Sequence, residues 1–411
     1  MSSEFIPDVN IGLVGHVDHG KTTLVSGITG QWTDRHSEEI KRGISIRLGY
    51  ADATIYKCPN CEGSDSYSVS EDCPVCGGKG EPYRTFSFVD APGHETLMAT
   101  MLSGSALMDG AMLVIAANEK CPQPQTKEHL MALELVGIKN IIIVQNKIDV
   151  VSQEQALAHY NQIKKFVKGT IAENAPVIPV SAQKGINMGA LLLAIDKYIP
   201  TPKRDPDDDP LMLIARSFDI NKPGCSWRDV RGGVIGGSLI SGIFVEGDEI
   251  EIRPGRKVEA ENQIHWEPIT TKITTMNAGN RKVSEATPGG LMGVGTKLDP
   301  AITKSDALSG QVAGHAGKLQ PVWDNLSFKV SLMERVVGAA DDALIDPLRH
   351  KEPLMLSVGT AVTVGVVVNT KKDVVEVVLK RPVCVAVGSR IAISRQVGGR
   401  WRLIGMGTLV E

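Results

Sequence analysis

The chain has 411 residues, of which 42% are hydrophobic and 22% are charged, and its formal net charge is −3. This length allows about two to three domains with real cores, and the composition is typical of a globular protein. A net charge so close to zero argues against a surface that is basic overall, although it leaves room for a local RNA-binding face.

No targeting or membrane segment is evident in the sequence. Residues 1–10 lack the basic and then apolar pattern of a signal peptide. The longest apolar runs, such as Ala111 to Ala117, are too short to span a bilayer. Seven cysteines, four of them tightly patterned, indicate metal binding in a reducing compartment rather than disulfides. We therefore expect a cytoplasmic protein with no membrane partner.

Residues 9–23 carry the clearest chemical pattern. An apolar run predicts a buried strand, and the phosphate-binding pattern Gly-x-x-x-x-Gly-Lys-Thr begins at Gly15. Glycines let backbone N–H groups turn toward phosphates, and the start of the following helix, expected over 24–30, adds positive potential. Lys21 is expected to reach the β- and γ-phosphates, and the Thr22 hydroxyl to bind Mg²⁺. The predicted nucleotide-binding residues of this loop are Asp18, His19, Gly20, Lys21, Thr22 and Thr23.

Two later segments are candidates for sensing the γ-phosphate. The polar stretch around Ser45 is either a solvated loop or a first switch whose hydroxyl supplies a second ligand to Mg²⁺. A predicted strand leads into Asp90-Ala-Pro-Gly93-His94, which has the Asp-x-x-Gly pattern of a phosphate sensor. Asp90 would hold Mg²⁺ through a water molecule, and Gly93 would present its backbone N–H to the phosphate. His94 would orient the attacking water, and with Lys21 it forms the predicted catalytic pair.

The motif Asn146-Lys147-Ile-Asp149 identifies the base. The Asp149 carboxylate can accept hydrogen bonds from N1–H and the 2-amino group of guanine, a pairing that adenine does not offer. Asn146 would bond the N7 side and brace the phosphate loop, while the stem of Lys147 covers the base. Farther on, the backbone N–H of Ala182 would meet guanine O6, and Ser181 and Gln183 complete the predicted contacts. GTP, with GDP as its product, is therefore the expected ligand.

Between the two switch segments lies an insertion with two Cys-x-x-Cys pairs, Cys58 with Cys61 and Cys73 with Cys76. Two such pairs in tight turns suit tetrahedral thiolate ligation of Zn²⁺. The polar residues between the pairs would hardly fold without the metal. Because the chain supplies all four ligands, we predict a structural site with no reactive water. The alternative is a redox pair, for which one motif would suffice.

The order of the elements predicts the domains. In the first half, strand candidates alternate with helical stretches such as 125–135 and 153–167, which predicts a doubly wound α/β sheet with the nucleotide at the carboxyl ends of its strands. Past a proline- and acid-rich linker, short β-rich runs separated by glycine predict two β-barrels. The expected division is a GTP-binding domain over 1–203 with the zinc insertion at 58–76, a linker over 204–210, a first barrel over 211–325 and a second over 326–411.

A basic and aromatic cluster lies near the C-terminus. It consists of Arg395, Arg400 and Arg402 with Trp401. The cluster is either an RNA contact or the stabilised end of a barrel, and composition favours the barrel end.

Together these motifs resemble the translational GTPases related to elongation factor Tu. The segments that carry the resemblance are Gly15–Thr22, Arg42–Ser45, Asp90–His94 and Asn146–Asp149. Within these GTPases, the four-cysteine insertion is similar to that of the gamma subunits of translation initiation factor 2, in their shorter archaeal form. Further segments with this similarity are Trp32–Glu39, Leu97–Gly104 and Val234–Ser238.

The resemblance implies a heterotrimer with alpha and beta subunits, the alpha subunit on the first barrel and the beta subunit on the nucleotide domain. It implies that the complex carries methionylated initiator tRNA to the small ribosomal subunit and releases it after GTP hydrolysis. By position, Thr22 and Ser45 would bind the main Mg²⁺, while Asp18 and the carbonyl of Gly43 would match a second magnesium site. Ser45 replaces the usual threonine of these proteins, and the missing methyl group would loosen the closed state.

Three functions follow from this sequence. The first is an initiation factor that hydrolyses GTP, slowly without the ribosome or partner factors. The second is a GTP-gated tRNA carrier with negligible turnover until the ribosome or another factor completes the site. The third is a relative that delivers an elongator or selenocysteinyl tRNA, against which the four-cysteine insertion and the lack of an extra C-terminal domain both count.

Overall fold

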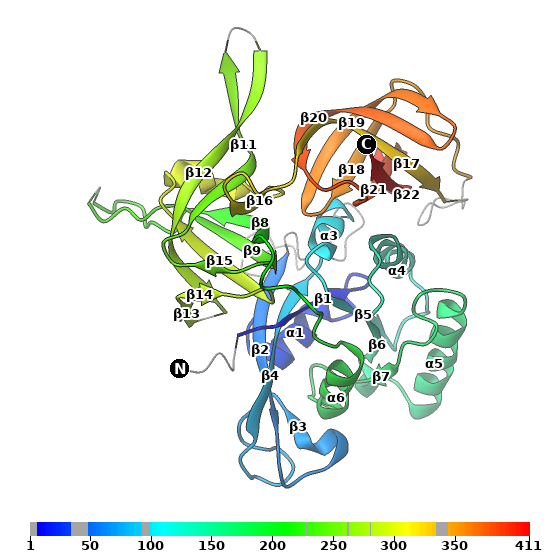
Figure 1. The fold of residues 1–411 in the computed structure, drawn as a ribbon. Helices are drawn as coiled ribbons and strands as arrows, with labels where there is room; N and C mark the ends of the chain where they lie inside the picture. Colours follow the sequence, from blue (N-terminus) through cyan, green and yellow to red (C-terminus); the bar gives the residue numbers. More distant parts are fainter. Residues whose placement is uncertain are drawn as a thin grey trace. The chain divides into compact units, whose positions relative to one another are not determined.

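A computed structural model describes residues 6–33, 48–92, 98–226, 228–260, 263–279, 281–333 and 344–411 (Figure 1). They form two compact units, one that runs to Pro202 and one that starts at Lys203.

The first unit is built on a single mixed sheet. Its elements are β1 (Val9–Val14), α1 (Lys21–Thr29), β2 (Gly49–Lys57), η1 (Gly63–Ser66), β3 (Tyr67–Ser68), β4 (Glu81–Asp90), α3 (Met98–Ser105), β5 (Gly110–Ala116), α4 (Pro124–Val136), β6 (Ile141–Asn146), η3 (Ile148–Val150), α5 (Gln153–Val167), β7 (Val177–Pro179) and α6 (Met188–Tyr198). The strand order is β3-β2-β4-β1-β5-β6-β7. Strands β4, β1, β5, β6 and β7 are parallel, and β2 is antiparallel to β4.

Helices cover the sheet because its central strands are apolar throughout. Every residue of β1 and β5 is buried, which requires cover on both faces of these strands. On one face, Leu24 of α1 and Leu191 and Ile195 of α6 pack with Ile11 and Leu13 of β1. The predicted doubly wound sheet is therefore confirmed, and the parallel strands end at the edge that carries the predicted nucleotide residues.

Strand β2 is a feature that the sequence analysis did not predict. Its residues alternate between buried and partly exposed positions, with Ala51, Ala53 and Ile55 facing the core. Alanine and aspartate are weak strand formers, so the local signal is faint. Pairing with β4 along its length decides the structure, and the strand leads directly into the four-cysteine insertion.

The described residues of the second unit form two β-barrels, as predicted, and in the structure each barrel is closed and has six strands. The elements of the first barrel and its connections are β8 (Leu211–Phe218), β9 (Val234–Ser241), β10 (Phe244–Val245), β11 (Glu249–Ala260), β12 (Gln263–Ala278), β13 (Arg281–Val283), β14 (Glu285–Ala286), β15 (Leu291–Thr296), α7 (Pro300–Thr303), η4 (Lys304–Asp306) and β16 (Val312–His315). Its ring is β11-β16-β8-β9-β15-β12, closed by pairing of β12 with β11. Beyond the ring, β11 and β12 continue as a long hairpin (Figure 1).

The second barrel begins with β17 (Val322–Leu332), which spans the expected boundary at 325/326. Its further strands are β18 (Pro353–Val358), β19 (Ala361–Lys371), β20 (Val374–Cys384), β21 (Arg390–Val397) and β22 (Arg400–Val410). They close in the order β17-β20-β19-β18-β21-β22, with β22 pairing back to β17.

The basic cluster near the C-terminus lies on the hairpin of β21 and β22. Arg395 forms an ion pair with Glu352 and donates to the carbonyl of Asp346 at 2.8 Å. Arg402 is buried in the barrel wall, and Trp401 is partly buried. These contacts support the interpretation of the cluster as a stabilised barrel end.

Candidate functional site

The phosphate loop connects β1 to α1 and contains backbone that only certain residues tolerate. Gly15 and Gly20 have φ angles of 143° and 84°, and Asp18 has a φ of 63°. A side chain at Gly15 would collide with the carbonyl oxygen of Val114, and one at Gly20 would approach the Asn146 side chain. Positive φ angles favour glycine at both positions, and a close neighbour adds to this, backbone at Gly15 and a side chain at Gly20.

Lys21 lies inside this loop rather than in solvent. Its ammonium group donates to the carbonyl oxygens of Gly15 at 3.0 Å and His16 at 2.8 Å. The side chain is buried, with 6% of the residue exposed. These bonds hold the Lys21 ammonium group inside the loop that was predicted to bind the phosphates.

A buried histidine supports the first glycine of the loop. The Gly15 N–H donates to Nδ1 of His129, from α4, at 2.8 Å. A backbone N–H can only donate, so this nitrogen must carry no proton. Burial, reinforced by the charge of Lys21, lowers the pKa of His129 to about 3. The ring is therefore neutral at neutral pH and serves as an acceptor.

A second buried histidine, His19, belongs to the phosphate loop itself. Its Nδ1 donates to the carbonyl of Val114 at 3.0 Å, and Nε2 lies 3.3 Å from Glu119. Burial lowers the pKa of His19 to about 4 although Val114 and Glu119 oppose the shift, so the ring is neutral at neutral pH. The ring anchors the loop from within, and the predicted contact of His19 with a nucleotide therefore falls to its backbone.

The predicted magnesium ligands on described residues lie next to each other. The Thr22 hydroxyl donates to Oδ2 of Asp90 at 2.7 Å, and Thr33 donates to the same oxygen at 2.8 Å. Asp90 is buried at the end of β4. A hydroxyl and a carboxylate side by side form a donor set that suits a hard cation such as Mg²⁺. Thr23 follows in the first turn of α1 and is partly buried.

Asn146 joins the phosphate loop to the loop that follows β7. Its amide Nδ2 donates to the carbonyl of His19 at 2.9 Å, and its Oδ1 accepts from the N–H of Ala182 at 3.0 Å. The residue is buried at the end of β6. The side chain thus uses a donor and an acceptor to connect two segments far apart in the sequence.

The other predicted base contacts lie around Asn146. Lys147 has a φ of 63° and precedes η3, on which Asp149 is exposed. Among the described residues, no partner for the Asp149 carboxylate is found, so it is available to a ligand. Ser181 is buried and its hydroxyl accepts from the N–H of Lys184 at 3.2 Å. Gln183 is exposed at the turn of the same loop.

Four predicted site residues lie outside the described residues. Gly43 and Ser45 belong to the range 34–47, and Gly93 and His94 to 93–97. The predicted second ligand of Mg²⁺ and the residue proposed to orient water therefore stay predictions.

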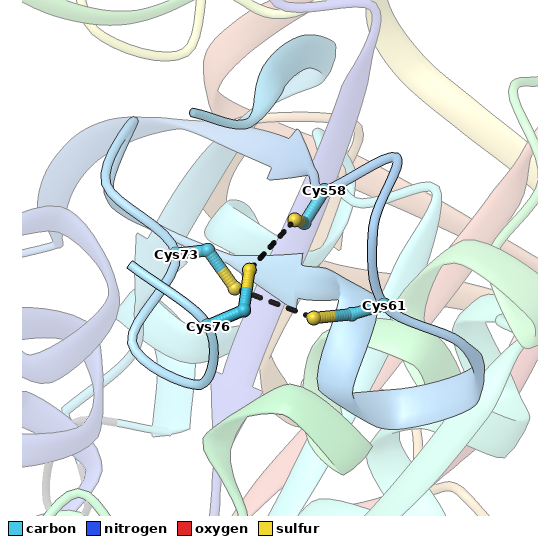
Figure 2. A group of neighbouring side chains, drawn as sticks. All are labelled: Cys58, Cys61, Cys73 and Cys76. Carbon is cyan, nitrogen blue, oxygen red and sulfur yellow. Dashed lines mark hydrogen bonds between the residues drawn. The ribbon is translucent and has the colours of Figure 1, made fainter. Parts of the chain in front are cut away.

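The four cysteines of the insertion converge on one point (Figure 2). All four sulfur atoms lie within 4.8 Å of one another. The closest pairs are Cys58 with Cys76 at 3.5 Å and Cys61 with Cys73 at 3.8 Å. Zn–S bonds of about 2.3 Å in a tetrahedron place sulfurs about 3.8 Å apart, so the cluster fits a zinc ion.

The cluster does not have the arrangement of a redox pair. Two of the close contacts join a cysteine of one motif to a cysteine of the other, and all four thiols are free. Backbone N–H groups of Cys76 and Val75 lower the pKa of Cys73 to about 7. The neighbouring thiols, Cys76 first, raise the pKa of Cys61 to about 12. Crowded thiols resist ionising together, which is the repulsion that a metal cation relieves.

His129 and Thr33 were not among the predicted site residues. His129 follows Gly15 by 114 positions, and a single histidine in an amphipathic helix carries no local signal of such a contact. Thr33 directly follows the turn after α1, where its hydroxyl could be taken for a solvated group. Only the folded chain brings these side chains to the phosphate loop and to Asp90.

Two family models match the chain. The first unit matches Elongation factor Tu GTP binding domain over residues 7–201. Residues 324–409, in the second barrel, match Initiation factor eIF2 gamma, C terminal.

Relatives extend this likeness over the whole chain. Translation initiation factor 2 subunit gamma of Archaeoglobus fulgidus is 61% identical over 409 residues, covering 100% of this chain and 96% of that protein. The same subunit of Methanococcus vannielii is 61% identical over 403 residues, covering 98% of each. The chain belongs to the initiation factor 2 gamma-subunit family. As a member, it has a translational GTPase domain for guanine nucleotides and is one subunit of a larger factor.

A solved structure shares the fold of this gamma-subunit family. The bacterial selenocysteine-specific elongation factor EF-Sec matches with a TM-score of 0.74 and 24% identity, covering 97% of this chain and 58% of that chain. This identity shows the fold alone, whereas the gamma subunits match at much higher identity. The family therefore favours translation initiation over the delivery of selenocysteinyl tRNA.

None of the helices in the described part of the chain combines the length and the apolar character needed to cross a bilayer.

Proposed function

We propose that this chain binds GTP and GDP in the first unit and that the bound nucleotide controls its hold on methionylated initiator tRNA. The proposal rests above all on Asn146, whose side chain ties the phosphate loop to the loop after β7. A guanine nucleotide has its phosphates at one of these loops and its base at the other. One side chain that fixes both loops sets their separation, which favours a ligand of that length.

Different residues of the proposed site would contact the phosphates and the base. Backbone N–H groups from Gly20 to Thr23 and the Lys21 ammonium would hold the phosphates, and Gly93 would add its N–H. At the base, Asp149 would accept from N1–H and the 2-amino group, while Ala182 donates to O6. The remaining proposed contacts are Asp18, His19, Lys147, Ser181 and Gln183.

Hydrolysis would depend on positioning and electrostatics. A bound Mg²⁺ would supply positive charge against the developing phosphate charge. Thr22 and Asp90 fit such an ion by their hydroxyl and carboxylate, and Ser45 would join them; Asp18 and Gly43 would form the second magnesium site. Lys21 would stabilise the same negative charge, and His94 would orient the water.

The four cysteines would hold a structural Zn²⁺, which would fix the shape of the insertion. The domain limits given above for the linker and the barrels stay predictions. As a gamma subunit the chain has partner subunits. We propose that the alpha subunit binds the first barrel and the beta subunit the nucleotide domain, in a cytoplasmic complex that delivers the tRNA to the small ribosomal subunit.

Binding of tRNA by the purified chain tests this function directly. Methionylated initiator tRNA and methionylated elongator tRNA are compared, with and without the alpha subunit, in the presence of a non-hydrolysable GTP analogue or GDP. We expect preference for the initiator, strengthened by the GTP analogue. Equal binding of both tRNAs would indicate an elongation-type carrier, and no binding even with the alpha subunit would refute the tRNA assignment.

Hydrolysis is tested separately, because a GTP-gated carrier with negligible turnover would bind the same ligands. In the isolated chain the rate would be slow, because the ribosome or a partner factor would have to complete the site. We expect ribosomes to raise the GTPase rate, and His94→Ala to abolish most of that increase. An unchanged stimulated rate in the variant would exclude the proposed role of His94.

A further inference from the structure

The four-cysteine insertion packs against α6, the helix that starts at the end of the guanine loop (residues 181–187). Between Cys61 and Cys73, the chain forms η1 and β3, and both contact this helix. Gly189 in its first turn lies under η1. A methyl group there would overlap the carbonyl oxygen of Ser64 and lie 3.3 Å from the carbonyl oxygen of Tyr67. Backbone therefore meets backbone without room for a side chain.

A second contact fixes the other end of the same helix. The Tyr67 hydroxyl donates to Asp196 at 2.9 Å, and Arg84 of β4 donates to the other carboxylate oxygen at 3.0 Å. The Lys57 ammonium lies over the rings of Tyr67 and Tyr83, at 5.3 and 5.1 Å from their centroids. The insertion thus holds α6 at both ends, through backbone at Gly189 and through Asp196.

The guanine loop leads directly into the first of these contacts. Ser181 and Ile186 exchange backbone hydrogen bonds of 3.2 and 3.1 Å across the loop. Asn187, the next residue, donates from its side chain to the carbonyl of Pro179 at 2.9 Å. Only one residue separates Asn187 from Gly189. A displacement of the first turn of α6 therefore pulls on the loop that presents the Ala182 N–H.

The cysteine cluster in turn sets the shape of the segment that touches α6. The Cys58 N–H donates to the carbonyl of Ser66 at 2.7 Å, and the Ser66 hydroxyl donates to the carbonyl of Gly63 at 2.8 Å. These bonds connect the first cysteine to both ends of η1. Tyr67 is buried in the core of the first unit and β3 pairs with β2, so these contacts anchor one end of the segment. Ligation of the four sulfurs would constrain the rest of the segment, which has few apolar side chains to bury.

We propose that the four-cysteine insertion is a buttress for the guanine loop, so that metal loading of the insertion sets the affinity of the chain for the guanine base. Ser64, Tyr67, Gly189 and Asp196 are the positioning residues of this device. The inference rests on the proposed nucleotide function and adds a role for the four cysteines, none of which is among the proposed nucleotide contacts.

The first test is Gly189→Ala, with Lys197→Ala as the matched control at an exposed position of the same helix. Alanine favours a helix, so a loss cannot come from weaker helix propensity. We expect GDP affinity to fall about tenfold, as for one lost backbone hydrogen bond of about 1.4 kcal/mol. Affinity for tripolyphosphate, which has no base, should not change, whereas general damage would lower both. Retained GDP affinity in the folded variant would overturn the proposal.

The second test uses the unaltered chain, in case Gly189→Ala does not fold. A zinc-selective chelator removes the metal, and hydrogen exchange is measured at residues 181–187 and at the phosphate loop. We expect faster exchange in the guanine loop only, reversed when zinc is restored, and a milder effect in Tyr67→Phe. Unchanged exchange in 181–187 would overturn the proposal. Since exchange needs no nucleotide, a chain that fails to bind GDP would count against the proposed function and leave this test intact.

Discussion

The proposed nucleotide site has a base end, around Asn146 and Asp149, and a phosphate end, at the phosphate loop. The two ends differ in whether their polar side chains are hydrogen-bonded to the chain itself. At the base end, Asn146 and the Ser181–Ile186 pair hold the loop in shape, while the Asp149 carboxylate has no partner among the described residues. At the phosphate end, Lys21 and Thr22 are bonded to the chain itself. In the proposed site, the Asp149 carboxylate would bind a base without giving up another partner, whereas Lys21 and Thr22 would exchange hydrogen bonds with the chain for hydrogen bonds with a ligand.

From this difference we infer which end would select the base and which end would respond to phosphates and metal. In the proposed site the Asp149 carboxylate would discriminate between bases, because a wrong base would leave it without its two donors. At the phosphate loop, the affinity would depend on the charge of the ligand, because Lys21 is a cation. It would therefore change with the number of phosphates and with bound metal. Four predictions follow for these two ends, in order of the effect expected.

The largest effect is expected at the base end, for Asp149→Asn. The amide cannot accept from both guanine N1–H and the 2-amino group with a full negative charge. At about 1.5–3 kcal/mol for a hydrogen bond to a charged group, GDP affinity should fall about 100-fold. Xanthosine diphosphate should bind the variant better than the unaltered chain. Calorimetric titration measures both, and an unchanged preference for GDP would contradict the assignment of the base.

The next effect concerns acid and the two buried histidines of the phosphate end. The pKa values of His129 and His19, about 3 and about 4 through burial, lie below the 6.5 of an exposed histidine. Between pH 6.5 and these values the unfolded chain binds more protons than the folded chain does. The free energy of unfolding is therefore highest above pH 6.5 and falls as the pH is lowered. At pH 5, each of the two histidines should lower the free energy of unfolding by about 2 kcal/mol relative to its value above pH 6.5.

Urea unfolding of the first unit at pH 7, 6 and 5 measures this loss. His129→Asn should reduce the loss of unfolding free energy between pH 7 and pH 5 by the contribution of one histidine. His350→Asn, at an exposed position of the second unit, should leave this loss unchanged. An equal slope in the His129 variant and the unaltered chain would show that the ring does not stay neutral in the fold.

A smaller effect on the ligand is expected for His129→Leu. The leucine leaves the Gly15 N–H buried without its acceptor, which should lower affinity for both GTP and GDP about tenfold. Asn places an acceptor oxygen where Nδ1 stood and should recover most of the loss. The ratio of GDP to ADP affinity should not change, because the base end is untouched. A variant that alters this ratio would show that the two ends are not separable.

The smallest effect is expected for Thr33→Val, which keeps the shape and removes the hydroxyl that donates to Asp90. Thr22 still donates to the same oxygen, so stability should fall by only about 1 kcal/mol. Thermal unfolding measures this change. A loss several times larger would mean that Thr33, and not Thr22, is the main partner of Asp90.

The fold class could be predicted because its signals are local. The apolar run of β1 and the helical periodicity of α5 each act within a few residues, and the structure has both elements where they were expected. The same holds for the four cysteines, whose spacing favoured a metal site over a redox pair and whose sulfur atoms cluster in the structure. Strand β2 was not predicted, because its residues have weak strand propensity and pairing with β4 stabilises the strand.

The sequence by itself determined which groups are available: the phosphate loop, the guanine motif and the two cysteine pairs. Each consists of neighbouring residues, so backbone conformation and spacing alone define its chemistry. Tertiary structure alone decided how these groups are supported. His129 reaches Gly15, Asn146 joins two loops, and Gly189 lies under Ser64. Contacts between distant segments depend on packing of the whole sheet and its helices, which no short stretch of sequence encodes.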